Sequence, residues 1–387
     1  MNFERDYKYF HRLDIPESKV PKGLYVERYG SRSKKVKVGT YDISMPVMPP
    51  KEEILNYGLP ISEQKFKRTV VPEDLRYWEK EKRDAFIATE WHKRKNGIWL
   101  YIKGKPYYMP GICYFFLNYW YTEKGHLPDF RFEALEFFWF THCLVDKDPN
   151  CYGGLIYKCR RIGDTEKVAC IQYEYASSHR GAWCGNQAQT DTDVAETFER
   201  IVNGHNHMVW FFRPVTRGTD KSVKRLLFDY LAERQTTKKL LARKKKGQVS
   251  SSKKYKHPSL RSKIDYKATK LGKYDGKRLD IFYGDEFGKL ELMDPNRQLE
   301  TVKRCLHLHG GMTITGIAIV TTTVEELGKN SNSLIWAEKL WDEADPEEKN
   351  ANGRTLNGLY RLFRPITKAA KCDEWGFHRE KEMEVYI

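Results

Sequence analysis

The sequence predicts an α/β protein built on a mainly parallel, doubly wound sheet. From residue 151 onward, short apolar strands alternate with helical segments, which is typical of such sheets. Two of these strands end in polar residues, at 284–286 and at 321–323. Of the 387 residues, 40% are hydrophobic and 14% aromatic, so the chain has enough apolar surface for a buried core and is not a disordered protein.

Composition also limits the classes of partner. There are 68 Lys and Arg against 52 Asp and Glu, a formal net charge of +16, which favours a polyanionic partner, most simply nucleic acid. No apolar run reaches ~20 residues and the N-terminus has no apolar signal core, so we expect neither a membrane span nor secretion. The eight cysteines include no Cys-x-x-Cys pair, which indicates free thiols in a reducing compartment.

The first 150 residues read as an N-terminal arm followed by an aromatic region. Prolines interrupt 1–75, which predicts an extended arm with short elements. We expect the region 76–150 to pack on the core, although its aromatic rings could instead stack on nucleotide bases. The elements predicted here are a helix at 73–96, a β-hairpin at 97–108, an aromatic block at 114–120 and a helix at 132–145.

The second part of the chain, 151–366, carries the predicted sheet, and a charged tail follows at 367–387. Thr190 precedes a helix with acidic residues in its first turn, a pattern that favours a helix start. The predicted strands are 155–157, 182–189, 278–283 and 312–320, and the predicted helices are 167–178 and 191–203.

The first segment with chemical meaning follows the strand 155–157. A strand, a tight loop containing Gly163 and a helix starting near Thr165 is the geometry that binds phosphates through backbone N–H groups. The Thr165 hydroxyl is a candidate Mg²⁺ ligand. The alternative is an ordinary basic turn before a helix. The candidate ATP-binding residues are Lys158, Arg160, Arg161, Gly163, Asp164 and Thr165.

Asp164 departs from the common phosphate-loop pattern G-x-x-x-x-G-K-[ST], because it occupies the position of the lysine. A carboxylate beside a triphosphate is repulsive unless it points away. The positive charge must then come from Lys158, Arg160 and Arg161 at the start of the loop.

The second segment is the strand 278–283 with the Gly284-Asp285-Glu286 that follows it. An apolar strand that delivers two adjacent carboxylates resembles a Walker B site. Asp285 would hold Mg²⁺, and Glu286 would orient and deprotonate the attacking water. The alternative is a common Asp-Glu turn.

The third segment is Thr321-Thr322-Thr323, at the end of the strand 312–320. In motor ATPases a polar residue at such a strand end senses the γ-phosphate and couples its loss to movement. The alternative is threonine in a strand, where its propensity is high. The order of the three segments is that of an additional-strand P-loop NTPase.

The chain resembles the large terminase subunit of tailed bacteriophages over about residues 90–375. Lys158, Arg161, Gly163 and Thr165 fit the variant loop K-x-x-R-x-G-x-[ST] of that family. Gly288-Lys289, Thr321–Glu326 and Asn352–Tyr360 also look like this family, and the aromatic region resembles the crAss-like phage type.

The resemblance implies an ATPase that uses ATP and Mg²⁺ to translocate double-stranded DNA into a procapsid, with Thr321, Thr322 and Thr323 in coupling. It implies a portal protein and a small terminase subunit as partners, a homo-oligomeric ring (a pentamer), and a place in the host cytoplasm, transiently on the procapsid. Only a short tail follows residue 366, so we expect the ATPase part without the C-terminal nuclease domain or its activity. Two alternatives remain: a P-loop helicase or translocase, and a non-enzymatic nucleic-acid-binding virion protein.

A basic segment interrupts the core at 236–263. It contains 11 Lys or Arg residues and no Asp or Glu. We expect an insertion that contacts DNA phosphates without sequence preference, or else a solvated loop. The candidate DNA-binding residues are Lys244, Lys245, Lys246, Lys253 and Lys254.

Overall fold

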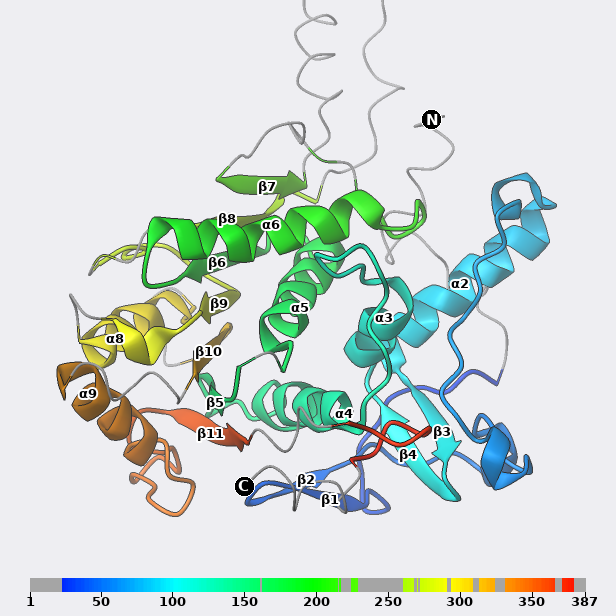
Figure 1. Cartoon of the computed structure of the whole chain (residues 1–387), viewed down its shortest axis with the longest axis horizontal. Coiled ribbons are helices and arrows are strands. Elements are labelled where there is room, and N and C mark those ends of the chain that lie inside the picture. The colour runs from blue at the N-terminus through cyan, green and yellow to red at the C-terminus, as the bar shows by residue number, and fades with distance from the viewer. Residues whose placement is uncertain are drawn as a thin grey trace, which may run out of the picture.

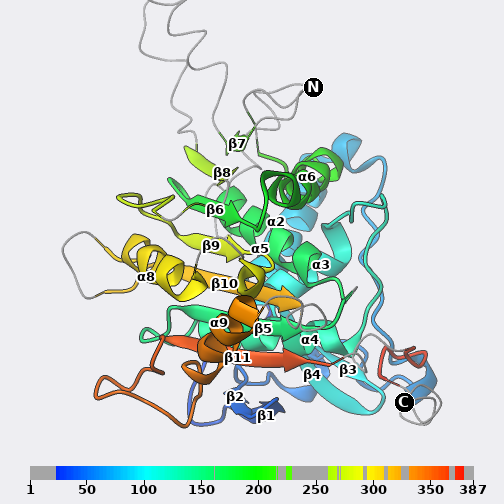
Figure 2. The same cartoon turned by 60° about the vertical axis from the view of Figure 1, so that its left-hand side comes forward.

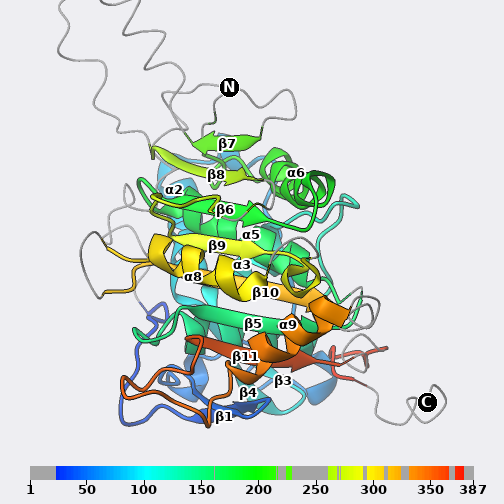
Figure 3. The same ribbon diagram turned by 90° about the vertical axis from the view of Figure 1, so that its left-hand side faces the viewer.

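The computed structural model describes residues 23–160, 162–214, 216, 224–228, 260–267, 270, 272–290, 294–308, 313–323, 331–365 and 371–378. Its centre is a seven-stranded sheet in the order β11-β5-β10-β9-β6-β8-β7 (Figure 3). All neighbouring strands are parallel except the edge pair β7 and β8. The strands are β5 (Gly153–Lys158), β6 (Trp183–Gln187), β7 (Arg225–Phe228), β8 (Ser262–Tyr266), β9 (Ile281–Gly284), β10 (Ile317–Thr323) and β11 (Leu359–Arg364).

Helices cover both faces of this sheet. Helices α5 (Asp164–Ser178) and α6 (Asp191–His207) lie on one face, and α8 (Pro295–Cys305) and α9 (Ser331–Asp342) lie on the other (Figures 1 and 3). The predicted fold class is therefore confirmed: the protein is an α/β protein with a mainly parallel, doubly wound sheet. Strand β10 is the additional strand, since it lies between β5 and β9.

The N-terminal elements pack on the α5 side and around the β11 edge (Figures 1 and 2). They are the hairpin β1 (Lys35–Val38) with β2 (Tyr41–Ser44), the helix α2 (Lys80–Asn96), the hairpin β3 (Ile98–Ile102) with β4 (Lys105–Met109), α3 (Gly111–Tyr119), and α4 (Phe132–Phe138), which continues as the π-helix η7 (Trp139–Val145). Short 3-10 turns are η4 (Lys51–Glu53), η5 (Ile61–Glu63), η6 (Leu75–Tyr77) and η8 (Phe287–Lys289).

The aromatic region forms part of the core, as the sequence favoured. Trp120 is fully buried, donates its indole N–H to Glu166 at 3.0 Å, and packs so closely on Gly204 of α6 that a Cβ there would lie 2.4 Å from the ring. Phe115 stacks on Tyr173 of α5 with ring centroids 6.4 Å apart. Such buried rings present no face on which a nucleotide base could stack.

Several element boundaries differ from the sequence prediction. The predicted helix 73–96 begins only at Lys80, because Leu75–Tyr77 forms a separate 3-10 turn. The predicted strand 312–320 runs instead from Ile317 to Thr323, so the three threonines belong to β10 rather than follow it. The sequence prediction did not include β7, β8 or β11.

The predicted basic insertion 236–263 also extends too far. Leu260 is buried, and Ser262 begins β8 and donates its hydroxyl to the carbonyl of Ala176 in α5. The last residues of that segment are thus part of the sheet. In the part of the chain that the structure describes, every helix is too short or too polar to cross a bilayer.

Candidate active site

Three strand ends meet at the carboxyl edge of the sheet. β5 ends at Lys158, which pairs in register with Thr323 at the end of β10. β9 ends at Gly284, which pairs with Val320 of the same β10. Since parallel strands share a direction, the three sequence segments that follow or end these strands lie side by side, at the edge where α/β sheets bind ligands.

The first segment turns from β5 into α5. Gly163 takes a left-handed conformation (φ 80°) and forms the N-cap of α5, which begins at Asp164. A Cβ at this position would meet nothing within 4 Å, so it is the backbone conformation rather than space that favours glycine. The open N-terminal N–H groups of a 15-residue helix provide a favourable environment for an anion. Arg160 is exposed in this turn, whereas Arg161 lies outside the described residues.

Lys158 connects this segment to the other two. Its amine lies 3.3 Å from a carboxylate oxygen of Glu286 and 3.4 Å from the hydroxyl of Thr323. Burial disfavours the charged amine, but the carboxylates of Glu286, Asp285 and Asp164 outweigh burial and raise the pKa of Lys158. The lysine is therefore a cation held almost out of solvent, with 7% of its surface exposed.

Glu286 is the most constrained of the predicted catalytic residues. Its backbone is in the left-handed region (φ 49°), which is uncommon for a non-glycine residue. Its carboxylate accepts hydrogen bonds from the backbone N–H of Thr323 at 2.8 Å and from the Thr323 hydroxyl, and pairs with Lys289 at 3.1 Å. Burial raises the pKa of Glu286, but Lys158, Thr323 and Lys289 together lower it to about 2. We call Lys158, Glu286 and Lys289 the active-site ion cluster.

Asp285 and Thr165, the two predicted Mg²⁺ ligands, both contact Tyr283. Asp285 accepts hydrogen bonds from the hydroxyls of Thr321 at 2.9 Å and Thr197 at 3.3 Å. The Tyr283 hydroxyl hydrogen-bonds Thr321 at 3.1 Å and also Thr165 and Asp285. A single phenol thus links the phosphate-loop helix, the β9 end and β10. The sequence analysis missed Thr197 and Tyr283, which no local motif marks.

Asp164 has a different environment from the one its position suggested. Its side chain is buried and pairs with Lys167 and with Arg364 at the end of β11, each at 3.0 Å. Lys167 and Arg364 also pair with Glu133 of α4. Burial disfavours the charged form, yet Arg364 and Lys167 hold the pKa of Asp164 below its usual value. We call these four residues the inner ion cluster; it turns the Asp164 carboxylate away from the open side of the loop.

The donor set at this edge fits Mg²⁺. Thr165 and Asp285 offer a hydroxyl and a carboxylate, which are hard oxygen ligands. Among the described residues, no three His, Cys, Asp or Glu side chains gather closely enough to form a metal cage. Mg²⁺ commonly binds through one carboxylate, waters and substrate phosphates rather than through an all-protein cage, so this sparse set is appropriate.

The remaining predicted residues divide into two groups. Thr321, Thr322 and Thr323 are all buried, and Thr322 accepts a hydrogen bond from the backbone N–H of Gly288 at 2.8 Å, so all three contact the segment after β9. The predicted DNA-binding residues Lys244, Lys245, Lys246, Lys253 and Lys254 lie outside the described residues.

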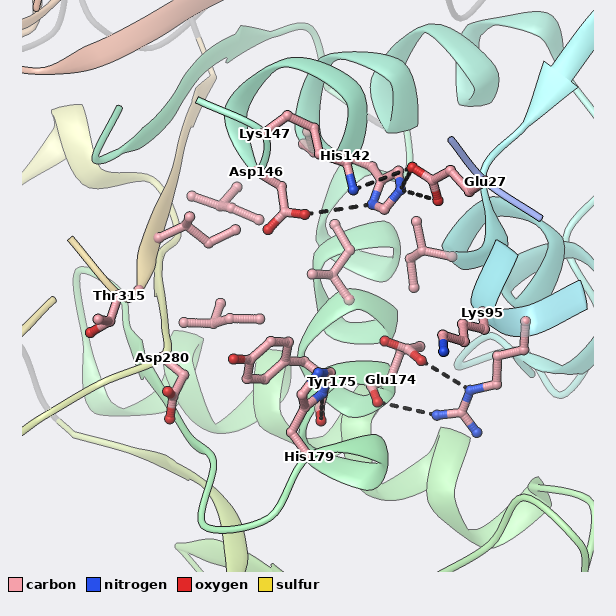
Figure 4. Close-up of a pocket in the computed structure, with 18 of the residues that line it drawn as sticks. Glu27, Lys95, His142, Asp146, Lys147, Glu174, Tyr175, His179, Asp280 and Thr315 are labelled. Atoms are coloured by element: carbon pink, nitrogen blue, oxygen red, sulfur yellow. Dashed lines mark hydrogen bonds and ion pairs between the residues drawn. The ribbon is translucent and has the colours of Figure 1, made fainter. Parts of the chain in front are cut away.

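A separate cavity of about 490 Å³ lies at the opposite, amino edge of the sheet (Figure 4). Ile281 and Ile317, the first residues of β9 and β10, contribute to its apolar floor. In Figure 4, Glu27 pairs with His142 and Lys147 at one side of the cavity, and Tyr175 and His179, from the end of α5, lie at another. Since Asp285 and Thr323 lie at the far ends of the same strands, this cavity is distinct from the site predicted from the sequence.

The fold is that of an α/β protein with a mainly parallel, doubly wound sheet, and the predicted site residues meet at the carboxyl edge of that sheet. No protein-family model matches the chain, and no curated protein matches its sequence. Three solved structures are similar to it. The large terminase ATPase domain of Thermus phage P74-26 is 14% identical, with 69% of this chain and 94% of that chain covered and a TM-score of 0.39. The large terminase of bacteriophage HK97 is 14% identical, with 70% of this chain and 49% of that chain covered and a TM-score of 0.41. The large terminase of the thermophilic bacteriophage D6E, in complex with ADP, is 10% identical, with 65% of this chain and 48% of that chain covered and a TM-score of 0.31. The chain spans about half the length of the HK97 and D6E proteins.

Proposed function

We propose that this protein is an ATPase that drives double-stranded viral DNA into a procapsid, as the ATPase part of a large terminase subunit. The observation that carries the ATPase proposal is the convergence of Lys158, Glu286 and Thr323, from three separate sequence segments, on one edge of the sheet. Each of these residues has an ordinary alternative explanation alone. A nucleotide-hydrolysing site needs a cation, a carboxylate and a strand-end hydroxyl near one bound phosphate, whereas unrelated turns need not meet at all.

In this proposal the triphosphate lies along the segment 158–165. The N-terminal N–H groups of α5 and the amine of Lys158 contact its oxygens, with further charge from Arg160 and Arg161. Bound Mg²⁺ would neutralise charge on the outer phosphates, with Thr165 and Asp285 as the residues that hold it. The protein's own contribution is to fix Asp285 through Thr321 and Thr197.

Glu286 is the proposed general base, which accepts a proton from the attacking water. With a pKa of about 2, its carboxylate is charged but weakly basic while Lys158 and Lys289 pair with it. A phosphate group that draws the Lys158 amine to itself removes one of these pairs. The basicity of Glu286 then increases when substrate is present, which limits water activation in the empty site.

Strand β10 is the proposed coupling element. Thr323 holds the Glu286 carboxylate through both its backbone N–H and its hydroxyl, and the same strand holds Asp285 through Thr321. A movement of the Asp285 or Glu286 carboxylate on hydrolysis would therefore displace β10, which lies in the middle of the sheet. The DNA substrate, the portal and small-subunit partners and the ring assembly of this proposal rest on the sequence resemblance to large terminases.

Nucleotide binding by the intact chain tests the proposal. Lys158→Ala combined with Arg161→Ala should weaken binding of a fluorescent ATP analogue with Mg²⁺ by about tenfold or more, because each charge-assisted contact contributes about 1.5–3 kcal/mol. Lys349→Ala, which removes an exposed lysine, is the matched control.

Equal affinity of the double variant and the control would overturn the site assignment, and no ATP binding by the wild type would favour the non-enzymatic alternative. Stimulation of ATP hydrolysis by procapsids rather than by single-stranded DNA would separate the packaging proposal from a helicase.

A further inference from the structure

One end of the sheet is open on the α8 side. Helices α8 and α9 lie over the middle strands, and no described helix lies over β6, β8 and β7 on this face (Figure 3). Side chains of β8 alternate between the two faces: Ser262 and Ile264 are buried toward α5 and α6, whereas Lys263 and Asp265 are on the open face. The open face of β8 therefore presents Lys263 and Asp265.

Four cations gather on this surface: Arg225 of β7, Lys263 of β8, and Lys267 and Lys277 of the segment that follows β8. We call them the β8 basic patch. Arg225 pairs in register with Asp265, and Lys263 with Trp183 of β6, which places both side chains on the same face. Burial, and then repulsion from Arg225, Lys267 and Lys277, lowers the pKa of Lys263 against the opposing effect of Asp265, so the other three cations are close enough to act on Lys263.

Two aromatic rings support these lysines. The Lys263 amine lies 3.3 Å from the centroid of the Trp183 ring, and the Lys267 amine lies 4.3 Å from that of Tyr274. Cation–π contacts of this kind hold the amines at defined positions without neutralising their charge. The lysines thus keep their positive charge at fixed places on the surface.

The acidic groups nearby have other partners. Asp265 accepts hydrogen bonds from the Trp183 indole at 3.0 Å and from the Tyr274 hydroxyl at 2.8 Å, and Asp280 accepts one from the Trp183 backbone N–H at 2.8 Å. Asp275 accepts one from the backbone of Gly276. Within the described residues, none of the four cations forms an ion pair. The four cations outnumber these three carboxylates, so a net positive charge remains on the surface, and an anion from outside the chain can balance it.

We propose that the β8 basic patch binds the phosphate backbone of double-stranded DNA. The choice of DNA as the polyanion rests on the proposed packaging function. The presence of a basic surface rests only on the positions of the four cations and their contacts with the two aromatic rings. An open sheet surface with several fixed cations suits repeated phosphates, which a protein contacts without reading base sequence. The patch consists only of described residues and differs from the predicted DNA-binding set Lys244, Lys245, Lys246, Lys253 and Lys254. Its Lys263 is the last residue of the predicted basic segment 236–263.

The test measures duplex DNA affinity as a function of salt for the full chain. Lys263→Gln with Lys267→Gln should weaken binding about tenfold or more at low salt and flatten the slope of log K against log salt by up to about 1.8, at ~0.9 per lost phosphate contact. Lys51→Gln with Lys80→Gln removes two exposed lysines of the N-terminal region and should leave the slope unchanged. Lys263→Arg with Lys267→Arg should restore wild-type binding, because it keeps the charges.

Two outcomes would overturn the inference: a slope in the Lys263/Lys267 variant equal to that of the wild type, or an equal loss in both glutamine pairs. ATP binding measured on the same samples keeps the two proposals apart. ATP binding with a salt slope that does not depend on Lys263 and Lys267 would reject the patch alone, whereas failure of the wild type to bind ATP would reject the proposed function.

Discussion

The active-site ion cluster and the inner ion cluster both involve the short segment 158–165, through Lys158 and Asp164 respectively, and both pair carboxylates with basic side chains. They differ in access to water. The Glu286 side chain retains 27% of its surface exposed, whereas Glu133 retains 4% and Asp164 none. An ion pair next to solvent can exchange a partner for a substrate, while a sealed one cannot. Position relative to solvent, rather than residue type, therefore separates the proposed catalytic carboxylate of Glu286 from the sealed carboxylates of Glu133 and Asp164.

The largest effect should follow from Glu286→Gln in the active-site ion cluster. The variant keeps the shape and the capacity to accept a hydrogen bond from Thr323 but loses the proton acceptor. ATP hydrolysis should fall on the order of 10²–10⁴-fold while binding of the ATP analogue is retained. Steady-state hydrolysis beside equilibrium binding measures both, with the exposed Glu300→Gln of α8 as control. Turnover close to wild type would show that Glu286 is not the general base. The difference in solvent exposure between the two clusters would then have no functional meaning.

A somewhat smaller effect, on folding rather than on rate, should follow from Glu133→Ala in the inner ion cluster. This change leaves Lys167 and Arg364 buried with one carboxylate, Asp164, between them. Removing one partner of a buried ionic group typically costs about 3–5 kcal/mol of unfolding free energy. Denaturant unfolding should detect the loss, and the exposed Glu79→Ala should show little change. A similarly small change in both variants would mean that the inner cluster is dispensable.

The smallest expected effect is on the acid dependence of stability. Glu286 has a pKa of about 2 in the folded protein against 4.5 ordinarily, so its contribution is present above pH 4.5 and is lost as the pH falls toward 2. It amounts to about 3 kcal/mol at most. The stability of Glu286→Gln should therefore fall less between pH 7 and pH 3 than that of the wild type. Identical acid profiles would show that the active-site pairs do not form in solution without nucleotide.

Much of the site followed from local pattern, because strand ends carry polar residues that stand out beside apolar runs. Lys158, Asp285, Glu286 and Thr323 were each identified in this way, and the structure brings all of them to one edge. Their mutual contacts could not be predicted from local pattern, because these contacts depend on which strands are neighbours. Only the placement of β10 between β5 and β9 makes Thr323 a partner of both Lys158 and Glu286.

Asp164 shows the limit of motif reading. Its position in the loop suggested contact with phosphates, but its ion-pair partners are Lys167 in its own helix α5 and Arg364 of β11, 200 residues further along the chain. No strand pattern marks β11, because its residues LYRLFR place Arg361 and Arg364 among the apolar positions. Arg364 can be buried because the carboxylates of Asp164 and Glu133 pair with it. These three residues are far apart in the sequence, so the pairing cannot be predicted before the fold is known.

The shared core has a consequence for how such a protein can diverge. One hydrophobic cluster runs from Val38 and Ile43 in the N-terminal hairpin, through the aromatic helices, to Ile319 in the middle of the sheet. The N-terminal region is therefore not an accessory that can be exchanged between relatives while the sheet stays the same. Substitutions in either part must be accommodated by the other, so the two parts of the chain are expected to evolve together even though only one of them carries the proposed active site.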